Sequence, residues 1–126
     1  MSVTLGANGI TFNDGTYQTY GDFLNSNGNS GYQRLPSGLL LQWGLGSQVS
    51  AGNNGTSQYM TFPVAFSTVY VVIPSINLNT STSGAYCHTP YSSGVSTTGF
   101  TWFMAAANNG NNTLTAQPAY FAIGLV

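Results

Sequence analysis

The chain has 126 residues, which is the length of one domain. Only Arg34, Asp14 and Asp22 carry a formal charge, so charged residues make up 2% of the sequence, against roughly 25% in an ordinary soluble domain. One arginine cannot neutralise the phosphates of a nucleic acid or form a basic patch for an anionic membrane surface. The apolar runs are far shorter than the roughly 18 residues of a membrane-spanning helix. The composition therefore excludes nucleic-acid partners and membrane insertion, and it favours a β-rich domain.

Residues 1–30 differ from the rest of the chain, because they hold only short apolar fragments between glycines and asparagines. Asn13-Asp14-Gly15 is typical of a tight turn and separates two β-like pieces, residues 10–12 and 16–19. So short a segment cannot bury enough apolar surface to fold alone. We therefore expect an extended segment that packs against other copies of the chain.

Residues 31–126 carry the patterns of β-strands. The expected strands are residues 39–43, 58–62, 69–73 (ended by Pro74), 85–89, 95–104 and 120–126, with loops at 53–55, 77–84, 90–94 and 108–112. The side chains expected in the core are Leu39, Leu41, Phe62, Phe66, Val71, Ile73, Phe100 and Ile123. Short strands between Gly- and Asn-rich turns predict an all-β domain built as an antiparallel β-sandwich.

Groups for catalysis or metal binding are scarce. A glycosidase needs two carboxylates across the bond that it cuts, and the only pair, Asp14 and Asp22, fits turn and loop residues better. Cys87-His88 is the one metal-capable pair, but zinc requires three or four ligands. Three copies around an axis could supply them, although a buried Cys beside a surface His is the favoured interpretation. We therefore predict no enzyme activity, no metal site and no cofactor.

Four motifs follow one another in a fixed order. They are residues 31–44 (GYQRLPSGLLLQWG), 62–66 (FPVAF), 98–100 (TGF) and 122–124 (AIG). Together they resemble the C-terminal knob of bacteriophage and prophage tail fibre proteins, and the resemblance covers about residues 31–126. Residues 9–19 separately resemble a piece found in fibre proteins upstream of their tips. Family members often carry an aromatic residue after the final Ile-Gly, whereas this chain ends in Leu125-Val126.

The resemblance implies a homotrimeric knob, residues 31–126, at the distal end of a tail fibre of the virion, outside the cell. Such a knob binds a host surface receptor, often a polysaccharide. Residues 1–30 would then support trimerisation and attach the knob to other tail or fibre proteins. A purely structural trimeric cap or connector with no ligand stays open as the alternative. The chain would be either a short, separately encoded tip or a fragment of a longer fibre.

Aromatic ring faces and amide or hydroxyl side chains are the groups that suit a neutral glycan. The stretch from residue 86 to residue 92 concentrates two tyrosines and the only histidine in a region expected to be rich in loops. The candidate ligand-binding residues are Tyr86, His88 and Tyr91, with Asn108 and Asn109 as sources of amides. For each of them the alternative, that it packs in the core or forms a turn, stays open.

Overall fold

The computed structural model describes residues 4–6, 9–11, 17–19, 28–35, 37–51, 55–78, 87–107 and 114–126. Every regular element in these ranges is a β-strand, and every pairing is antiparallel. The strands are β1 (Thr4–Gly6), β2 (Gly9–Thr11), β3 (Tyr17–Thr19), β4 (Gly31–Arg34), β5 (Leu39–Leu45), β6 (Val49–Ala51), β7 (Thr56–Thr61), β8 (Thr68–Leu78), β9 (Cys87–Ser93), β10 (Gly99–Ala107) and β11 (Leu114–Leu125). The predicted antiparallel all-β fold is therefore confirmed.

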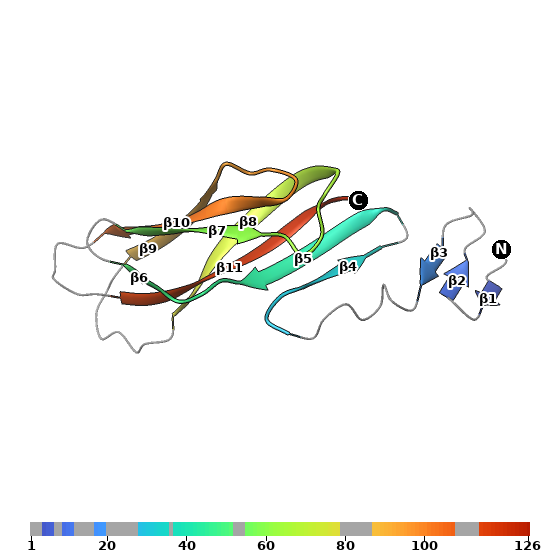
Figure 1. The fold of residues 1–126 in the computed structure, drawn as a ribbon, viewed down its shortest axis with the longest axis horizontal. Helices are drawn as coiled ribbons and strands as arrows, with labels where there is room; N and C mark the ends of the chain where they lie inside the picture. The colour runs from blue at the N-terminus through green and yellow to red at the C-terminus, as the bar shows by residue number, and fades with distance from the viewer. Residues whose placement is uncertain are drawn as a thin grey trace.

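Two sheets form the body of the molecule (Figure 1). One holds β4, β5, β11 and β6 in that order, with β8 along β11, and the other holds β7, β10 and β9. β1, β2 and β3 form a small third sheet that lies apart from the other two in Figure 1. In that sheet Ile10 pairs with Gln18, so strands flank the expected turn, which itself lies outside the described residues.

β11 is the central strand of the larger sheet, and it contains a proline. Its C-terminal half pairs with β5 and its N-terminal end pairs with β6, so Pro118 lies at the gap between those two neighbours. The Gly46 N–H donates to the Pro118 carbonyl at 2.8 Å. Proline has no N–H to return that bond, and Gln117 Nε2 donates to the Gly46 carbonyl instead, at 3.0 Å. The side-chain amide therefore replaces the missing rung of the ladder.

Two strands run through prolines that the sequence pattern treats as strand ends. β8 continues past Pro74 to Leu78, so the predicted strand end at Pro74 is wrong. β9 continues past Pro90 to Ser93, so the predicted loop at residues 90–94 is wrong except at its last residue. Among the described residues β8 pairs only with β11 and β9 only with β10. Both are edge strands, where proline is tolerated because one row of N–H groups has no partner strand.

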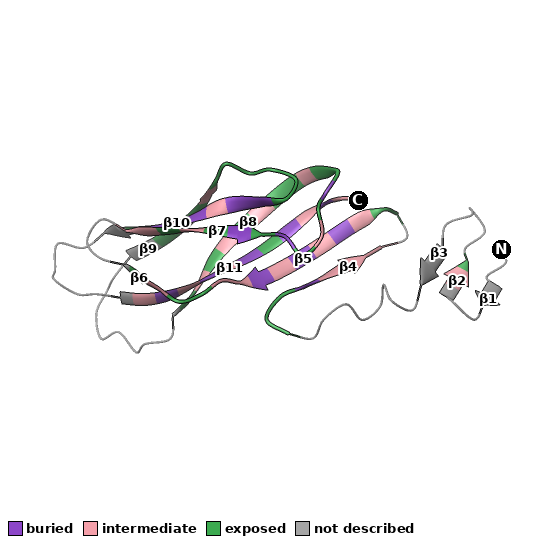
Figure 2. Ribbon diagram, viewed as in Figure 1, coloured by how far each residue is buried: buried purple, intermediate pink, exposed green. Residues whose placement is uncertain are grey.

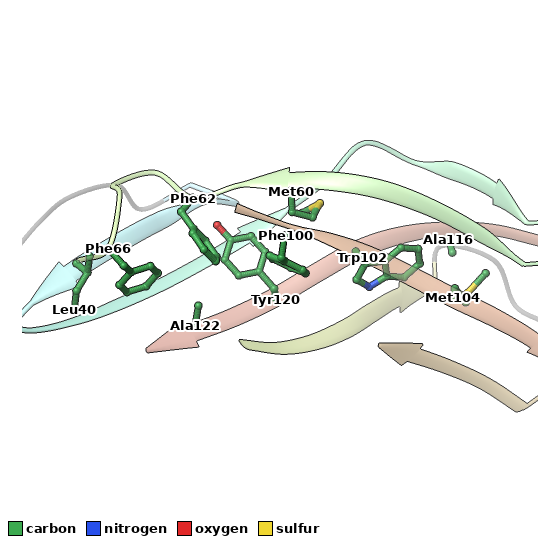
Figure 3. Packing of buried hydrophobic residues seen from close by; sticks show 10 residues of the cluster. All are labelled: Leu40, Met60, Phe62, Phe66, Phe100, Trp102, Met104, Ala116, Tyr120 and Ala122. Atoms are coloured by element: carbon green, nitrogen blue, oxygen red, sulfur yellow. The ribbon is translucent and has the colours of Figure 1, made fainter. Parts of the chain in front are cut away.

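The core lies between the two sheets and is dominated by aromatic rings (Figure 3). Phe62 packs edge-on against Phe66, with ring centroids 5.0 Å apart, and Phe100 packs edge-on against Tyr120 at 5.3 Å. Trp102 is fully buried on β10, and its indole N–H donates to the Ser75 carbonyl on β8 at 3.0 Å. This bond ties the edge of one sheet to the middle of the other.

Burial alternates along β5 but does not follow side-chain polarity (Figure 2). Leu40, Gln42 and Gly44 are buried, whereas the odd-numbered side chains Leu39, Leu41, Trp43 and Leu45 are only half-buried. The predicted core is confirmed for Phe62, Phe66 and Phe100. It is wrong for Leu39, Leu41, Val71, Ile73 and Ile123, which are half-buried or exposed. These five lie on the outer face of the larger sheet, because alternate residues of a strand face opposite ways.

The four sequence motifs meet at one end of the core. The Gln42 side chain accepts the Val64 N–H at 2.9 Å and donates to the Val64 carbonyl at 2.7 Å, so it pairs like a strand with the second motif. Phe62 N–H donates to the Thr98 carbonyl at 2.9 Å. In the first motif the Gly38 N–H donates to the Leu35 carbonyl at 3.0 Å with Gly38 at φ +81°, and this bond closes a tight turn before β5. The motifs therefore build the fold, and the ligand surface has to be sought elsewhere.

Candidate functional site

Each of the two large sheets has an outer face that no other described element covers. We call the outer face of β5, β8 and β11 the apolar face; its side chains are Leu39, Leu41, Trp43, Leu45, Val71, Ile73, Phe121, Ile123 and Leu125. We call the outer face of β7, β9 and β10 the tyrosine face; its side chains are Ser57, Tyr59, Thr61, Thr89, Tyr91, Ser93, Thr101, Phe103 and Ala105.

The apolar face is continuous across three strands. Phe121 on β11 lies directly opposite Trp43 on one side and Ile73 on the other, and Ile123 likewise lies between Leu41 and Val71. Ile73 is 52% exposed, which is far more than an isoleucine on a covered sheet face. Directly opposed residues share a face and touch, so these rows form one apolar surface open to the solvent.

Charge is nearly absent from both faces. Arg34 on β4 is the one formally charged side chain in the described ranges, and its guanidinium carbon lies 6.0 Å from the ring centre of Tyr32. Both aspartates, Asp14 and Asp22, lie outside those ranges. Neither face therefore offers a charged partner to a phosphate or a carboxylate.

The tyrosine face has a different chemistry from the apolar face. Hydroxyl side chains from Ser57, Thr61, Thr101 and Ser93 surround three aromatic rings. Phe103 lies opposite both Ser57 and Tyr91, and Thr101 lies opposite both Tyr59 and Ser93. The result is a sheet surface on which ring faces and hydroxyl groups alternate.

Two of these rings are held in place by their neighbours. Tyr91 stacks on Phe103 with ring centroids 5.0 Å apart and an angle of 6° between the planes. Tyr59 leans over Gly99 on β10: a Cβ built on Gly99 would lie 2.7 Å from the Tyr59 hydroxyl oxygen. The absence of a side chain at Gly99 is thus what allows the Tyr59 ring to lie against the sheet.

The structure places two of the five predicted site residues on a strand. Tyr91 is on β9, 47% exposed, and His88 is on the same strand with its backbone opposite Ala106. Tyr86, Asn108 and Asn109 lie outside the described residues. β9 starts and β10 ends side by side, with Cys87 opposite Ala107.

Sequence reasoning missed Tyr59 and Phe103 as surface aromatics. The signal was present, because the alternation in residues 58–62 and 95–104 places each of them on the face opposite the buried Met60 and Trp102. Pairing between β7, β9 and β10 is what brings the two rings to the same face as Tyr91, and that pairing is not readable from single strands.

One further ionisable group in the described ranges, Tyr120, lies buried in the core. Burial raises the pKa of Tyr120 to about 12, and its hydroxyl has no hydrogen-bond partner among the described residues. The same ranges hold no group of three or more His, Cys, Asp or Glu side chains that could bind a metal ion. They also hold no helix that is long and apolar enough to cross a membrane.

The fold is similar to that of pyocin tail fibres. A P. aeruginosa R1 pyocin fibre structure matches with a TM-score of 0.67 and 23% identity, over 79% of this chain and 27% of that one. An N-truncated R1-type pyocin tail fibre matches with a TM-score of 0.66 and 22% identity, over 79% and 82% of the two chains. An N-truncated R2-type fibre matches with a TM-score of 0.55 and 24% identity, over 79% and 36%. At these identities the likeness establishes the fold.

The sequence identifies the family. No curated protein matches the chain. Residues 34–125, which are most of the chain, match the family described as "Putative tail fiber protein gp53-like, C-terminal". The matched region begins at the last residue of β4 and closes with β11, so it contains all the other strands of the two large sheets and all of the buried core. The chain therefore belongs to this family of tail-fibre C-terminal domains.

Proposed function

We propose that this chain forms the homotrimeric receptor-binding tip of a tail fibre, on a phage virion or a pyocin-like particle outside the cell. It binds a glycan on the host cell surface during adsorption. The observation that carries the proposal is the family match, because it covers residues 34–125 and concerns the C-terminal part of a tail fibre protein. Knob function then has to come from the surfaces that this fold exposes.

The chemistry of the exposed surface favours a neutral glycan as the receptor. Sugar rings offer C–H faces that pack on aromatic rings, and hydroxyls that bond to amides and hydroxyls. The described surface supplies aromatic rings and hydroxyls, and it has one charged side chain, Arg34. Ligand contacts are proposed at Tyr86, His88 and Tyr91, with Asn108 and Asn109 adding amides from the same or a neighbouring subunit.

The apolar face supports self-association. Val71, Ile73 and Phe121 are more than a third exposed in the single chain, and no charge interrupts the surface around them. Copies of this face can pack together without burying an unpaired ion, which would cost several kcal/mol. We propose that the subunits of the trimer meet through this face, and that residues 1–30 attach the trimer to other tail or fibre proteins.

Adsorption of the purified full-length protein to a panel of bacterial strains tests the proposed function. The expected result is that labelled protein binds at least one strain, and that surface polysaccharide extracted from that strain blocks the binding. If the intact trimer binds none of the strains, the chain is instead a structural cap or connector. If a protease treatment of the cells abolishes binding and the polysaccharide does not compete, the receptor is a protein and the glycan assignment fails.

A further inference from the structure

We propose that the tyrosine face is a platform on which Tyr59 and Tyr91 each stack one sugar ring of a neutral, hexose-containing glycan. The inference rests on the proposed function, because it names where on the knob the receptor lies and which groups hold it. It adds a sheet surface to the ligand contacts proposed above, and Tyr91 belongs to both.

The Tyr91 ring can accept a sugar on one of its two faces. One of its faces is occupied by Phe103, nearly parallel at 6° and with 5.0 Å between centroids. Tyr91 is nevertheless 47% exposed, so its other face is open to solvent. A ring already held by a neighbour loses little conformational freedom when a ligand packs on it, and this pre-organisation raises affinity.

The Tyr59 ring is held in a second way. It leans over Gly99, where a Cβ would come within 2.9 Å of its Cζ, and it is still 57% exposed. The backbone of Gly99 therefore lies against one side of the Tyr59 ring, and the other side of the ring faces the solvent. Tyrosine is well suited to this use because the ring is apolar and the hydroxyl can bond to a sugar hydroxyl.

The spacing of the two tyrosines requires an oligosaccharide. They belong to β7 and β9, the two outer strands of the sheet, with β10 between them. Two strand spacings amount to about 10 Å, and the two tyrosines are also offset by two residues, about 7 Å, along the strands, because Tyr59 pairs with Thr101 and Tyr91 with Phe103. Thr101 on the middle strand lies opposite Tyr59 and Ser93, so hydroxyls capable of donating and accepting line the space between the rings.

A neutral glycan fits this face better than a second copy of the chain. The apolar face presents aliphatic and aromatic side chains in unbroken rows, which suits subunit packing, whereas the tyrosine face interrupts its rings with Ser57, Thr61 and Thr101. Burying those hydroxyls against another protein surface without partners would cost free energy. The described part of this sheet carries no Lys or Arg, so a phosphorylated or acidic sugar would gain no ion pair here.

The test uses the full-length protein on an array of bacterial O-antigen polysaccharides that includes neutral, phosphorylated and acidic members. The variants are Tyr59→Ser, Tyr91→Ser, the conservative Tyr91→Phe, and Val95→Ser as a control, because Val95 is 47% exposed between β9 and β10 and off the platform. Affinity is then measured by titrating an oligosaccharide released from the bound array member into each protein, so that avidity does not contribute. Each Tyr→Ser change is expected to weaken binding about tenfold, while Tyr91→Phe and Val95→Ser stay within about twofold.

The outcomes separate this inference from the proposed function. Binding by the wild-type protein that survives both Tyr→Ser changes leaves receptor binding in place and overturns the platform. Binding restricted to the phosphorylated or acidic members overturns the neutral-glycan assignment. Dissociation of the trimer by Tyr59→Ser or Tyr91→Ser, seen by sedimentation, means that a second copy occupies this face. If the wild-type protein binds no array member and adsorbs to no strain, the proposed function fails and this inference fails with it.

Discussion

Replacing Gln42 with leucine should destabilise the knob by about 3 kcal/mol. Gln42 is fully buried, and its amide makes two hydrogen bonds to the backbone of Val64, at 2.9 and 2.7 Å. Each such bond contributes about 1 kcal/mol net, and an unpaired buried N–H or C=O costs about 1–3 kcal/mol. Val64 is only half-buried, so water can reach part of it and the lower end of the penalty applies. Leucine fills a similar volume, which keeps a cavity from adding to the loss.

Urea denaturation followed by tryptophan fluorescence measures this change, with all proteins compared at one protomer concentration because assembly contributes to stability. Gln58→Leu is the matched control. The Oε1 atom of Gln58 is buried and has no hydrogen-bond partner among the described residues, so removing it should leave stability unchanged or higher. A loss below 1 kcal/mol for Gln42→Leu, or equal losses for both variants, would refute the role given to Gln42.

Gln42→Glu adds a second test, because the stability of this variant should change with pH in a known direction. An ionised carboxylate would be buried and would face the Val64 carbonyl, whereas the protonated acid can donate to that carbonyl as the amide does. Burial therefore raises the folded-state pKa of this glutamate above its unfolded value of about 4.3. The stabilising contribution is complete below about pH 4.3 and is lost as pH rises through the folded-state pKa. A variant whose stability relative to wild type does not change with pH contradicts this geometry.

Three further predictions concern the core and the apolar face. Phe100→Ala removes a fully buried ring that packs on Phe62 and Tyr120, and urea titration should show a loss of about 3–5 kcal/mol; a loss under 1 kcal/mol would mean that the core is packed differently. Tyr120→Phe removes a buried hydroxyl without a described partner, so stability at pH 7 should stay equal or rise. Because the pKa of Tyr120 is raised to about 12, the unfolded state ionises first, and wild-type stability should fall between pH 10 and pH 12 by more than that of Tyr120→Phe; identical alkaline profiles would disprove this. Ile73→Asp puts a charge on the apolar face and should convert the trimer to monomers in sedimentation, whereas Val95→Asp should not; an intact Ile73→Asp trimer would rule out this face as the subunit contact.

The sequence predicts the strands better than it predicts their faces. In β5 the apolar run Leu39-Leu40-Leu41 indicates a strand correctly, but every position in it can be read as core. The chain buries Gln42 and Gly44 and turns Leu41 and Trp43 outward. Gln42 can be buried because Val64, 22 residues away, provides both partners for its amide. That contact depends on the fold, so no pattern within the strand could reveal it.

The candidate site, too, can be predicted from the sequence only in part. Tyr91 stands out in the sequence as an aromatic in a polar stretch, but Pro90 makes the stretch look like a loop. The structure keeps it in strand β9, since a proline is tolerated at the sheet edge. Phe103 and Tyr59 join it only through the register of β10 with its two neighbours, which sequence alternation does not fix.

Binding of the purified 126-residue protein to the polysaccharide array tests the proposed receptor binding directly. We expect saturable binding to at least one neutral surface polysaccharide, and competition by the same polysaccharide free in solution. A folded protein that binds no polysaccharide on the array and adsorbs to no bacterial strain would contradict receptor binding, and the chain would then be a structural part of the tail.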